Sequence, residues 1–391
     1  MIRKRHIAYM IFVVLVCYII SPWFFEKKLL FNELLSATGL FLFCYKRFKM
    51  GSDLISICIL LLLAWGTVHL IVSLVRADSM YYYLRNTVII YSVFTFFIGY
   101  YGYPYLSGFV RKFRTLLQVY IISFLFLPVS RFLFERFGMS TLFPSLFKKI
   151  SNRWMLPALI FLNIIYAFTY ASLTSSILAC FYFFLLLVPG YRFFKQTCFL
   201  GFLVFACVFI YLIPNLSLIA VHYSYKNNSA IWQVIRSNPL LSIDGNSTWR
   251  LVLWKQVIID KFPSNIFGMG FGTPLLRYFP IEDFTKVPSL PYIIGAHNSF
   301  VYLFGRLGIV YVILMIAIYR KVFKEYFYFK HYYYSSRGIF IFWSFFAITF
   351  IALFNPTLES PIFSGAYWFF LGLLARVIIK REQTIQSNPS K

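Results

Sequence analysis

The sequence predicts an all-α membrane protein, a polytopic transmembrane helical bundle of about 11–12 spans with one large loop on the outer side of the membrane. Three observations predict this class. The 391-residue chain is 60% hydrophobic, 22% aromatic and only 13% charged. Apolar runs of about 20 residues, the length that crosses a bilayer, recur along nearly all of it. The runs are uniformly apolar rather than alternating, which favours helices over the strands of a membrane barrel, because a helix satisfies its own backbone hydrogen bonds in lipid.

The formal net charge of +25 would indicate nucleic-acid binding in a soluble chain. Here Lys and Arg form short clusters between apolar runs, as in the cytoplasmic loops of membrane proteins, so no nucleic-acid partner is predicted. The cysteines lie in or beside apolar runs and form no C-x-x-C pair, so neither a disulfide framework nor a metal site is expected. They are Cys17, Cys44, Cys58, Cys180, Cys198 and Cys207.

Eleven apolar runs divide the chain, and the first begins like a secretory signal, with basic residues before an apolar stretch. No small-residue cleavage site follows, which predicts an uncleaved first span. The runs cover residues 7–25, 29–45, 54–75, 86–103, 115–134, 154–173, 175–189, 197–218, 299–319, 338–354 and 361–379. They predict N-terminal transmembrane helices in residues 1–218, a large outer loop in 219–296, C-terminal transmembrane helices in 297–380 and a cytoplasmic tail in 381–391.

The basic clusters at both ends of the chain predict cytoplasmic termini. Counting back from the C-terminus through the basic loop 320–337 places the segment 222–296 outside the membrane. Counting forward through eight runs from an inside N-terminus places the same segment inside. An additional span or re-entrant piece in residues 131–153 resolves the difference of one crossing, and an outside N-terminus is the alternative.

The long polar loop contains a predicted helix that begins near Trp249, after capping residues, and ends before Pro263. Arg250 lies in its first turn, and Trp254 lies one turn later on the same face, so the guanidinium can stack on the indole. A planar, permanently charged guanidinium suits a diphosphate. The alternative is an arginine that contacts only solvent or a lipid headgroup.

Three alternating glycines, Gly268, Gly270 and Gly272, follow this helix and precede Pro274. They predict a turn that lets backbone amides approach a ligand, or another stretch of backbone, closely. The segment is not a dinucleotide fingerprint, because no strand precedes it in a βαβ unit and Pro274 interrupts any following helix. A plain tight turn is the alternative.

His297 lies where the loop meets the apolar run that starts at Ser299. The positive end of the helix dipole favours a neutral imidazole, which suits a general base, and the same end attracts phosphate. A capping or interfacial histidine is the alternative. Within the apolar runs ionisable side chains are sparse, with His69 the clearest and Glu33 and Glu359 nearer the ends, which argues against an ion-coupled transporter.

These residues together resemble the O-antigen ligase family. His297-Asn298, followed after nine residues by Gly308 and then by Tyr311, is similar to the signature of that family. The upstream Trp249-Arg250, Trp254, Pro263 and the three glycines resemble the loop that the family shares with O-antigen and capsule polymerases. The similarity is close over residues 247–320 and rests on topology elsewhere.

The resemblance implies a multi-pass enzyme of the bacterial inner membrane whose site faces the periplasm. It would transfer glycan, with inversion, from undecaprenyl diphosphate and without metal or other cofactor. His297 would activate an acceptor hydroxyl, and Arg250 would bind the donor diphosphate and stabilise the departing charge. Asn298 would orient the histidine or the acceptor. Arg277 and the three glycines are further candidates for substrate binding, and membrane lipid and other polysaccharide assembly proteins are expected partners.

The sequence departs from many ligases at residues 173–177, Leu-Thr-Ser-Ser-Ile, where an arginine is expected near the start of a span. The difference and the short loop favour a polymerase of O-antigen or capsule repeat units over a ligase that transfers glycan to lipid A-core. The alternative is that Arg153, Arg236 or Arg277 takes the role of that arginine. A polysaccharide flippase or exporter and a non-catalytic membrane scaffold are alternatives of other classes.

Overall fold

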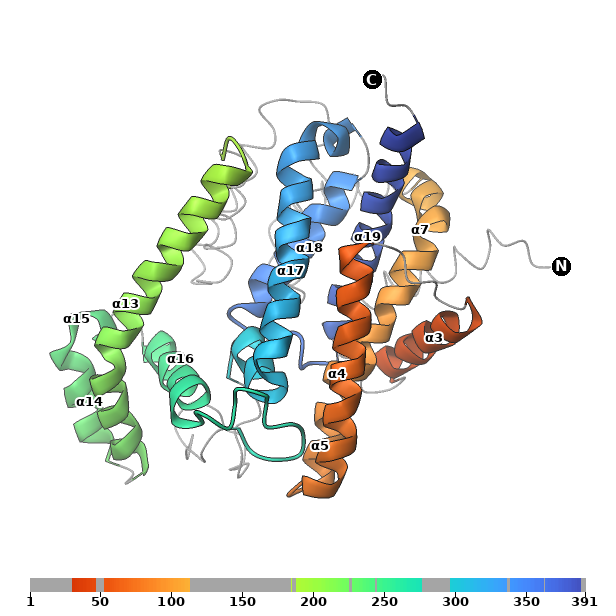
Figure 1. Ribbon diagram of the computed structural model, residues 1–391. Helices are drawn as coiled ribbons and strands as arrows, with labels where there is room; N and C mark the ends of the chain where they lie inside the picture. The colour runs from red at the N-terminus through yellow and green to blue at the C-terminus, as the bar shows by residue number, and fades with distance from the viewer. Residues whose placement is uncertain are drawn as a thin grey trace, which may run out of the picture.

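The computed structural model describes residues 30–46, 53–112, 184, 188–224, 227–242, 245–275, 296–335, 338–361 and 363–387. Within these ranges the chain forms helices and no strand, and its long helices pack side by side (Figure 1). Several predicted features lie outside the described residues. They are the first span, the runs 115–134 and 154–173, nearly all of the run 175–189, the piece 131–153, the segment 173–177, Arg153 and Arg277.

Most of the described helices overlap the predicted runs, whereas the run 86–103 is divided among four consecutive elements. In chain order they are α3 (Phe31–Tyr45), α4 (Leu54–Arg76), α5 (Met80–Asn86), α6 (Val88–Tyr91), η1 (Ser92–Phe94), α7 (Thr95–Lys112), α13 (Tyr191–Ser224), α14 (Asn228–Ser237), α15 (Pro239–Ser242), α16 (Gly245–Lys255), the π-helical η3 (Gln256–Asp260), α17 (Ser299–Ser335), α18 (Gly338–Ala352) and α19 (Ser364–Ser387). The all-α prediction is therefore confirmed for the part of the chain that the structure describes.

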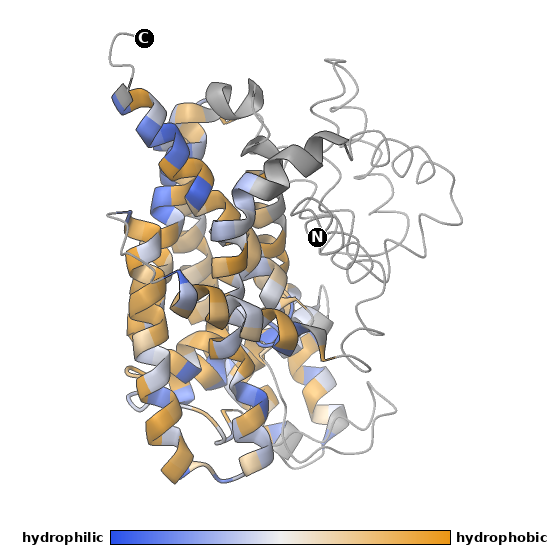
Figure 2. Cartoon of the chain, turned by 90° about the vertical axis from the view of Figure 1, so that its right-hand side faces the viewer, coloured by the Kyte–Doolittle hydropathy of each residue, from blue (hydrophilic) through white to orange (hydrophobic). Residues whose placement is uncertain are grey.

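Three of the described helices are long and apolar enough to cross a membrane, over Leu54–Arg76, Tyr191–His222 and Ser299–Phe329. Apolar side chains cover the middle of the long helices, and polar ones gather toward the two ends (Figure 2). The chain is thus a helical protein with candidate membrane spans, and the larger number of spans stays a prediction.

The bundle has two distinct ends, which we name by what lies there (Figure 1). The loop end carries α14, α15, α16, the start of α17 and the α18–α19 connection, residues 353–363. The tail end carries the start of α4 and the C-terminal halves of α17 and α19. Because α4 and α13 run toward the loop end and α17 runs away from it, the residues around 250 and 297 come to the same end of the molecule.

Close helix contacts position these elements. Gly39 packs against the carbonyl of Phe94, Gly99 against that of Phe369, and Gly372 against that of Phe96, so that a side chain at any of these glycines would overlap backbone. Small residues at such crossings are the usual means by which membrane helices approach closely. They draw α3, α7 and α19 together beside the core.

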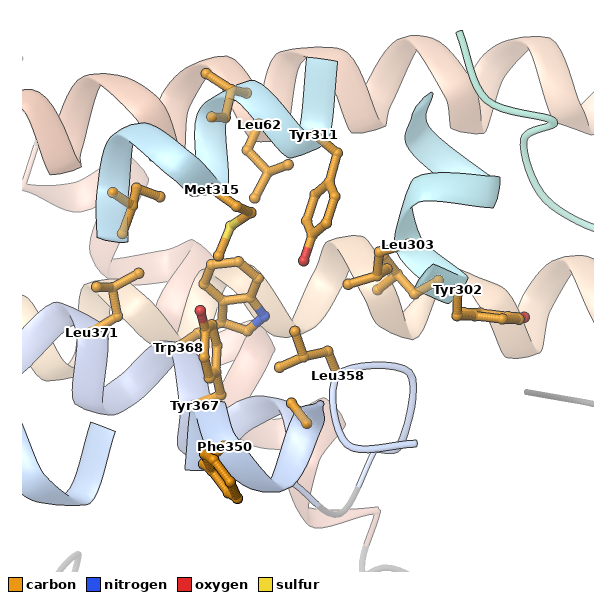
Figure 3. Close-up of a cluster of buried hydrophobic side chains, with 14 of the residues drawn as sticks. Leu62, Tyr302, Leu303, Tyr311, Met315, Phe350, Leu358, Tyr367, Trp368 and Leu371 are labelled. Carbon is orange, nitrogen blue, oxygen red and sulfur yellow. The ribbon is translucent and has the colours of Figure 1, made fainter. Parts of the chain in front are cut away.

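The core between α17 and α19 is built from large buried side chains (Figure 3). Tyr311 and Met315 of α17 face Trp368 and Leu371 of α19, and Leu62 of α4 closes one side. Such dense packing gives many weak dispersion contacts. In a membrane, packing contacts of this kind favour the association of helices, because lipid tails are as apolar as the side chains. The core holds the first half of α17, and therefore the segment that precedes it, in a fixed place.

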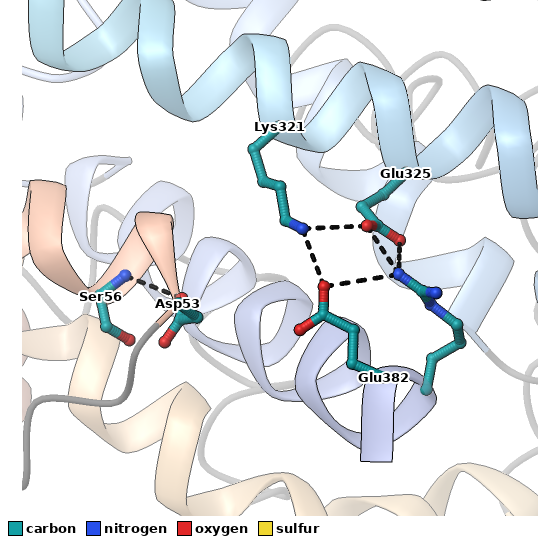
Figure 4. A network of polar contacts seen from close by, with 6 residues as sticks. Asp53, Ser56, Lys321, Glu325 and Glu382 are labelled. Atoms are coloured by element: carbon teal, nitrogen blue, oxygen red, sulfur yellow. Dashed lines mark hydrogen bonds and ion pairs between the residues drawn. The ribbon is translucent and has the colours of Figure 1, made fainter. Parts of the chain in front are cut away.

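At the tail end, an ion-pair network joins α17 to α19 (Figure 4). Arg381 contacts Glu325 at 2.6 Å, and Lys321 contacts Glu325 at 3.1 Å and Glu382 at 2.8 Å. The Arg381 guanidinium also lies 3.7 Å from the centre of the Phe329 ring. Burial and, to a smaller extent, the neighbouring Glu382 raise the pKa of Asp53 at the start of α4.

Candidate functional site

Helix α16 carries Arg250 toward the α18–α19 connection. Its nearby Thr248 is buried and donates to the carbonyl of Leu241 at 2.8 Å, which fixes the first turn. Arg250 is partly buried, and its Nη1 donates to the carbonyl of Phe354 at 2.9 Å. A residue of the long polar loop thus reaches a segment 104 positions further along the chain.

The same helix fixes the peptide before His297. The indole N–H of Trp254 donates to the carbonyl of the buried Ala296 at 2.8 Å, and its ring lies 6.1 Å from that of Phe205 on α13. The sequence predicts that this indole stacks on Arg250. In the structure, its N–H fixes the chain at Ala296. Through Arg250 and Trp254, one helix positions two other segments of the loop end.

His297 is exposed to solvent and has a left-handed backbone, with φ of 50°. Few residues other than glycine adopt this conformation, so it usually reflects a constraint imposed by the surrounding structure. Protein atoms around the imidazole desolvate it partially, and the positive charge of Arg250 acts in the same direction, so the pKa of His297 is lowered from its ordinary value of 6.5. A lowered pKa keeps the ring neutral at pH 7, as a general base requires.

Asn298 has a role that the sequence analysis did not assign. Its Oδ1 accepts from the amides of Phe300 at 2.9 Å and Val301 at 3.1 Å, so the side chain caps helix α17. The residue is buried, and its carbonyl accepts the first helical hydrogen bond, from Tyr302. A fixed cap in turn fixes the peptide plane next to His297.

Ser299 and Glu359 form a polar junction beneath His297. The hydroxyl of Ser299 donates to Glu359 at 2.5 Å and accepts from the amides of Thr357 and Leu358. Burial raises the pKa of Glu359 to about 7, despite the opposing hydrogen bond from Ser299. The sequence analysis treated Glu359 only as an ionisable residue near a membrane boundary. The signal that could have found it is a single acidic residue in the polar break between two apolar runs.

The structure therefore brings Arg250 and His297 together, close enough for the charge of one to shift the pKa of the other. Both are tied to residues 354–359, Arg250 directly and His297 through Ser299. The arrangement places a fixed cation, a neutral imidazole and a partly titrated carboxyl at one end of the bundle. It can accept a proton from a hydroxyl and stabilise negative charge nearby.

The three glycines have left-handed φ values of 92° at Gly268, 72° at Gly270 and 79° at Gly272. The amide of Gly270 donates to the carbonyl of Arg306 at 3.0 Å, and that of Gly272 to Asn86 Oδ1 at 3.3 Å. A side chain at Gly268 would overlap the backbone of α17. The geometry of this turn is therefore that of close approach to another stretch of backbone. The amides of Gly270 and Gly272 donate to groups of the protein itself.

Arg306 is a further residue that the sequence analysis missed. It is buried on α17, and its Nη1 donates to the carbonyls of Gly270 at 3.0 Å and Thr273 at 2.7 Å. Its Nη2 donates to the hydroxyl of Tyr302 at 3.1 Å, which also accepts from Asn86. A charged residue inside an apolar run was the available signal.

The remaining candidates are placed apart or not described. Arg277 lies outside the described residues, and Arg236 is exposed on α14. Within the described part of the chain, His, Cys, Asp and Glu side chains form no group of three or more that could hold a metal ion.

A comparison of the chain with protein families, with curated proteins and with solved structures finds no match.

Proposed function

We propose that the chain is a membrane-embedded glycosyltransferase of the O-antigen ligase and polymerase superfamily, with about 11–12 spans in the bacterial inner membrane. Its donor is a glycan linked to undecaprenyl diphosphate, its site faces the periplasm, and it joins repeat units of a surface polysaccharide. The observation that carries the proposal is the proximity of Arg250 and His297, which lie 47 positions apart in the chain and share one electrostatic environment. The resemblance at the same two residues supports it.

In the proposed reaction, the neutral imidazole of His297 accepts the proton of an acceptor hydroxyl as its oxygen attacks the anomeric carbon. The new C–O bond forms on the face opposite the diphosphate, and the bond from the anomeric carbon to the diphosphate oxygen breaks with its electron pair. Arg250 stabilises the negative charge that develops on the leaving diphosphate. Because the pKa of His297 is lowered, the imidazolium then readily loses the proton to water.

Arg250 and His297 also have complementary effects on each other in this scheme. A fixed positive charge disfavours the imidazolium and so keeps the base neutral before the reaction. The bound anionic donor partly compensates that charge, which makes protonation of His297 easier when the proton is transferred. In this reaction, cations that stabilise the leaving diphosphate matter more than carboxylates. A retaining glycosidase would instead require two carboxylates close together.

The first experiment replaces each residue singly in a strain that lacks the chromosomal copy. His297→Ala and Arg250→Ala should each abolish long-chain glycan without changing membrane abundance, and Arg250→Lys should also be poor, because a point charge does not reproduce bidentate contact with phosphate. The matched controls are His222→Ala and Arg76→Ala, which alter the same two residue types elsewhere; Arg76 is exposed at the end of α4. Wild-type glycan from either His297→Ala or Arg250→Ala would overturn the site assignment.

The second experiment identifies the acceptor. In the deletion strain, a gel ladder of lipopolysaccharide is compared with the pool of undecaprenyl-linked intermediates. A polymerase predicts that single repeat units remain on the lipid core while long chains disappear. Long chains that accumulate on undecaprenyl diphosphate would instead identify a ligase, and unchanged pools would contradict the proposed substrate.

A further inference from the structure

The polar loop between α16 and α17 contains a segment, residues 256–275, that lies against the sides of two candidate spans rather than beyond their ends. The carbonyl of Ile266 accepts from the amide of Ile309 at 2.7 Å, and a side chain at Gly308 would overlap Phe267. On the other side, His69 of α4 hydrogen-bonds to the backbone of Phe267. Segment 256–275 is therefore held between α4 and α17 at Phe267.

Two independent rulers give the depth of that point. Along α17, Gly308 lies nine residues after Ser299, which corresponds to roughly 14 Å of helix rise. Along α4, His69 lies seven residues before Arg76, which corresponds to about 10 Å. Helix α17 is interrupted at Gly308, whose φ is 70°, and its second part from Ile309 to Tyr319, where the charged residues of the tail end begin, adds roughly 15 Å. The two parts together are about one hydrocarbon thickness long. Phe267 is therefore well inside the apolar layer that these helices define.

From Phe267 the chain climbs back out along α4. A side chain at Gly270 would meet the hydroxyl of Ser73, and one at Gly272 would meet Ala77, just beyond the end of α4. The amide of Phe271 donates to Ser73 Oγ at 2.8 Å, and Gly272 accepts from Ser79. At the start of the segment, a side chain at Gly305 of α17 would meet Val257, whereas Ile266 pairs with Ile309 further along that helix. The segment therefore goes in along α17 and comes out along α4, which is the path of a re-entrant loop.

The polar backbone of the segment is satisfied as a re-entrant loop requires. Irregular backbone at membrane depth is tolerated only where protein groups replace water. The amide of Met269 donates to Gly305 and that of Gly270 to Arg306, while the Arg306 guanidinium donates to the carbonyls of Gly270 and Thr273. The buried Arg306 thus serves a backbone that would otherwise face hydrocarbon.

Large apolar side chains of the same segment are exposed, although its backbone is covered. Phe262 and Phe267 are each 67% exposed, and Ile258 and Ile259 are also exposed. Beyond the end of a helix, such side chains would meet water, which is unfavourable for apolar surfaces of this size. At its depth, Phe267 meets the same environment as the outward side chains of α17, such as Ile313.

We propose that residues 256–272 form a re-entrant segment whose exposed side chains, Phe267 foremost, contact the acyl chains of the lipid leaflet at the loop end of the bundle. The partner of this surface is the hydrocarbon of the bilayer, and the inference does not depend on the catalytic proposal. The segment would hold the turn after α16 at a fixed depth in the membrane. A lipid-anchored molecule that diffuses in this leaflet would then contact the apolar surface of the segment on its way to Arg250.

The depth is measured by placing a nitroxide on Phe267→Cys, in a variant with the six native cysteines replaced by alanine, in vesicles of phosphatidylethanolamine and phosphatidylglycerol. Ile313→Cys on α17 is the lipid control, and Ser229→Cys, exposed on α14, is the water control. The Phe267 probe should collide with oxygen as frequently as the Ile313 probe and be protected from a water-soluble nickel chelate. Exposure to the chelate equal to that of the Ser229 probe would overturn the proposal.

A second measurement keeps the six native cysteines in place and attaches no nitroxide. Phe267→Asp should lower membrane abundance several-fold, because a carboxylate facing hydrocarbon is strongly disfavoured, whereas Phe267→Leu should not. Ser229→Asp is the matched control and should leave abundance unchanged. Equal abundance of the Phe267→Asp and Phe267→Leu variants would show that this side chain meets water, and the re-entrant depth would then be wrong.

Discussion

The two ends of the bundle hold their buried arginines in different ways. At the tail end, Arg381 faces the carboxylate of Glu325 at 2.6 Å, and Lys321 bridges to Glu382 (Figure 4). At the loop end, Arg306 donates to two backbone carbonyls and a tyrosine hydroxyl, and among the described residues no carboxylate lies within ion-pair distance of it. Arg250 likewise donates to a carbonyl, that of Phe354.

The two ends differ in how the charge of the arginine is compensated, rather than in the number of hydrogen bonds that it makes. A carboxylate partner cancels the charge of an arginine, whereas a carbonyl dipole orients the guanidinium and leaves its charge in place. At the tail end, the ion pairs that join α17 to α19 therefore cancel the charges of their own side chains. At the loop end, the positive charge of Arg250 acts on His297 and helps to lower its pKa.

The first prediction tests how strongly the loop end depends on Arg306. Arg306→Ala removes the partner of the Gly270 and Thr273 carbonyls at membrane depth and should lower the free energy of unfolding by about 3 kcal/mol or more. Arg306→Lys should be intermediate, because an ammonium cannot reproduce the fork that reaches both carbonyls. The measurement is the temperature of half-aggregation in detergent, together with membrane abundance.

The control for Arg306 is Arg236→Ala, which removes an exposed arginine from α14 and should change neither readout. A normal aggregation temperature for Arg306→Ala would mean that the glycine turn is held without the guanidinium. The contrast between the two ends would then be lost.

The second prediction tests whether the tail end behaves as a neutralised pair. Arg381→Met leaves Glu325 with Lys321 as its charged partner in the network and should cost about 1–3 kcal/mol of unfolding free energy. The double variant Arg381→Met with Glu325→Gln should cost less than the sum of the two single variants, because both charges leave together. Additive losses in the same thermal assay would show that the pair is not coupled.

The helices and the convergence of the site were accessible from the sequence because both depend on local patterns. Apolar runs predicted α4, α13 and α17, and capping residues with Pro263 predicted the helix that carries Arg250. A fixed outer loop between two spans was enough to expect Arg250 and His297 at one end of the bundle. The hydrogen bond from Arg250 to the carbonyl of Phe354 joins residues 104 positions apart and has no local signature.

The roles of single polar residues were less accessible, because they depend on partners distant in the chain. Asn298 was predicted to orient the histidine or the acceptor, and that role stays a prediction; its side chain also caps α17, which a capping rule applied at Ser299 could have indicated. Gly268 meets the backbone of α17, and Gly270 meets Ser73 of α4, neither of which lies nearby in sequence. Arg306 was overlooked because the run around it is apolar enough to predict a span regardless of its charge.

The third prediction separates charge from contact at the loop end. Arg250→Gln removes the positive charge that lowers the pKa of His297, so that pKa should rise toward its ordinary value of 6.5, while Arg250→Lys should leave it low. Diethyl pyrocarbonate acylates only the neutral imidazole, so the pH midpoint of His297 modification, read by mass spectrometry, should move to higher pH in Arg250→Gln alone.

His222 in the same sample is the internal control for this measurement, and its modification profile should be the same in all three proteins. Identical His297 midpoints in wild type and Arg250→Gln would mean that burial alone sets the pKa. The readout needs no catalytic turnover, so it stands apart from the test of glycan synthesis.

The smallest predicted effect concerns the backbone of His297, whose φ of 50° is unfavourable for any residue with a side chain. Glycine adopts this conformation without strain, so His297→Gly should be more stable than His297→Ala by about 1 kcal/mol, although both should lack product. Glycine also gains freedom in the unfolded chain, which opposes the effect, so a positive difference requires strain larger than that entropy. A less stable His297→Gly in the thermal assay would show that the turn before α17 accommodates a side chain at this position without strain.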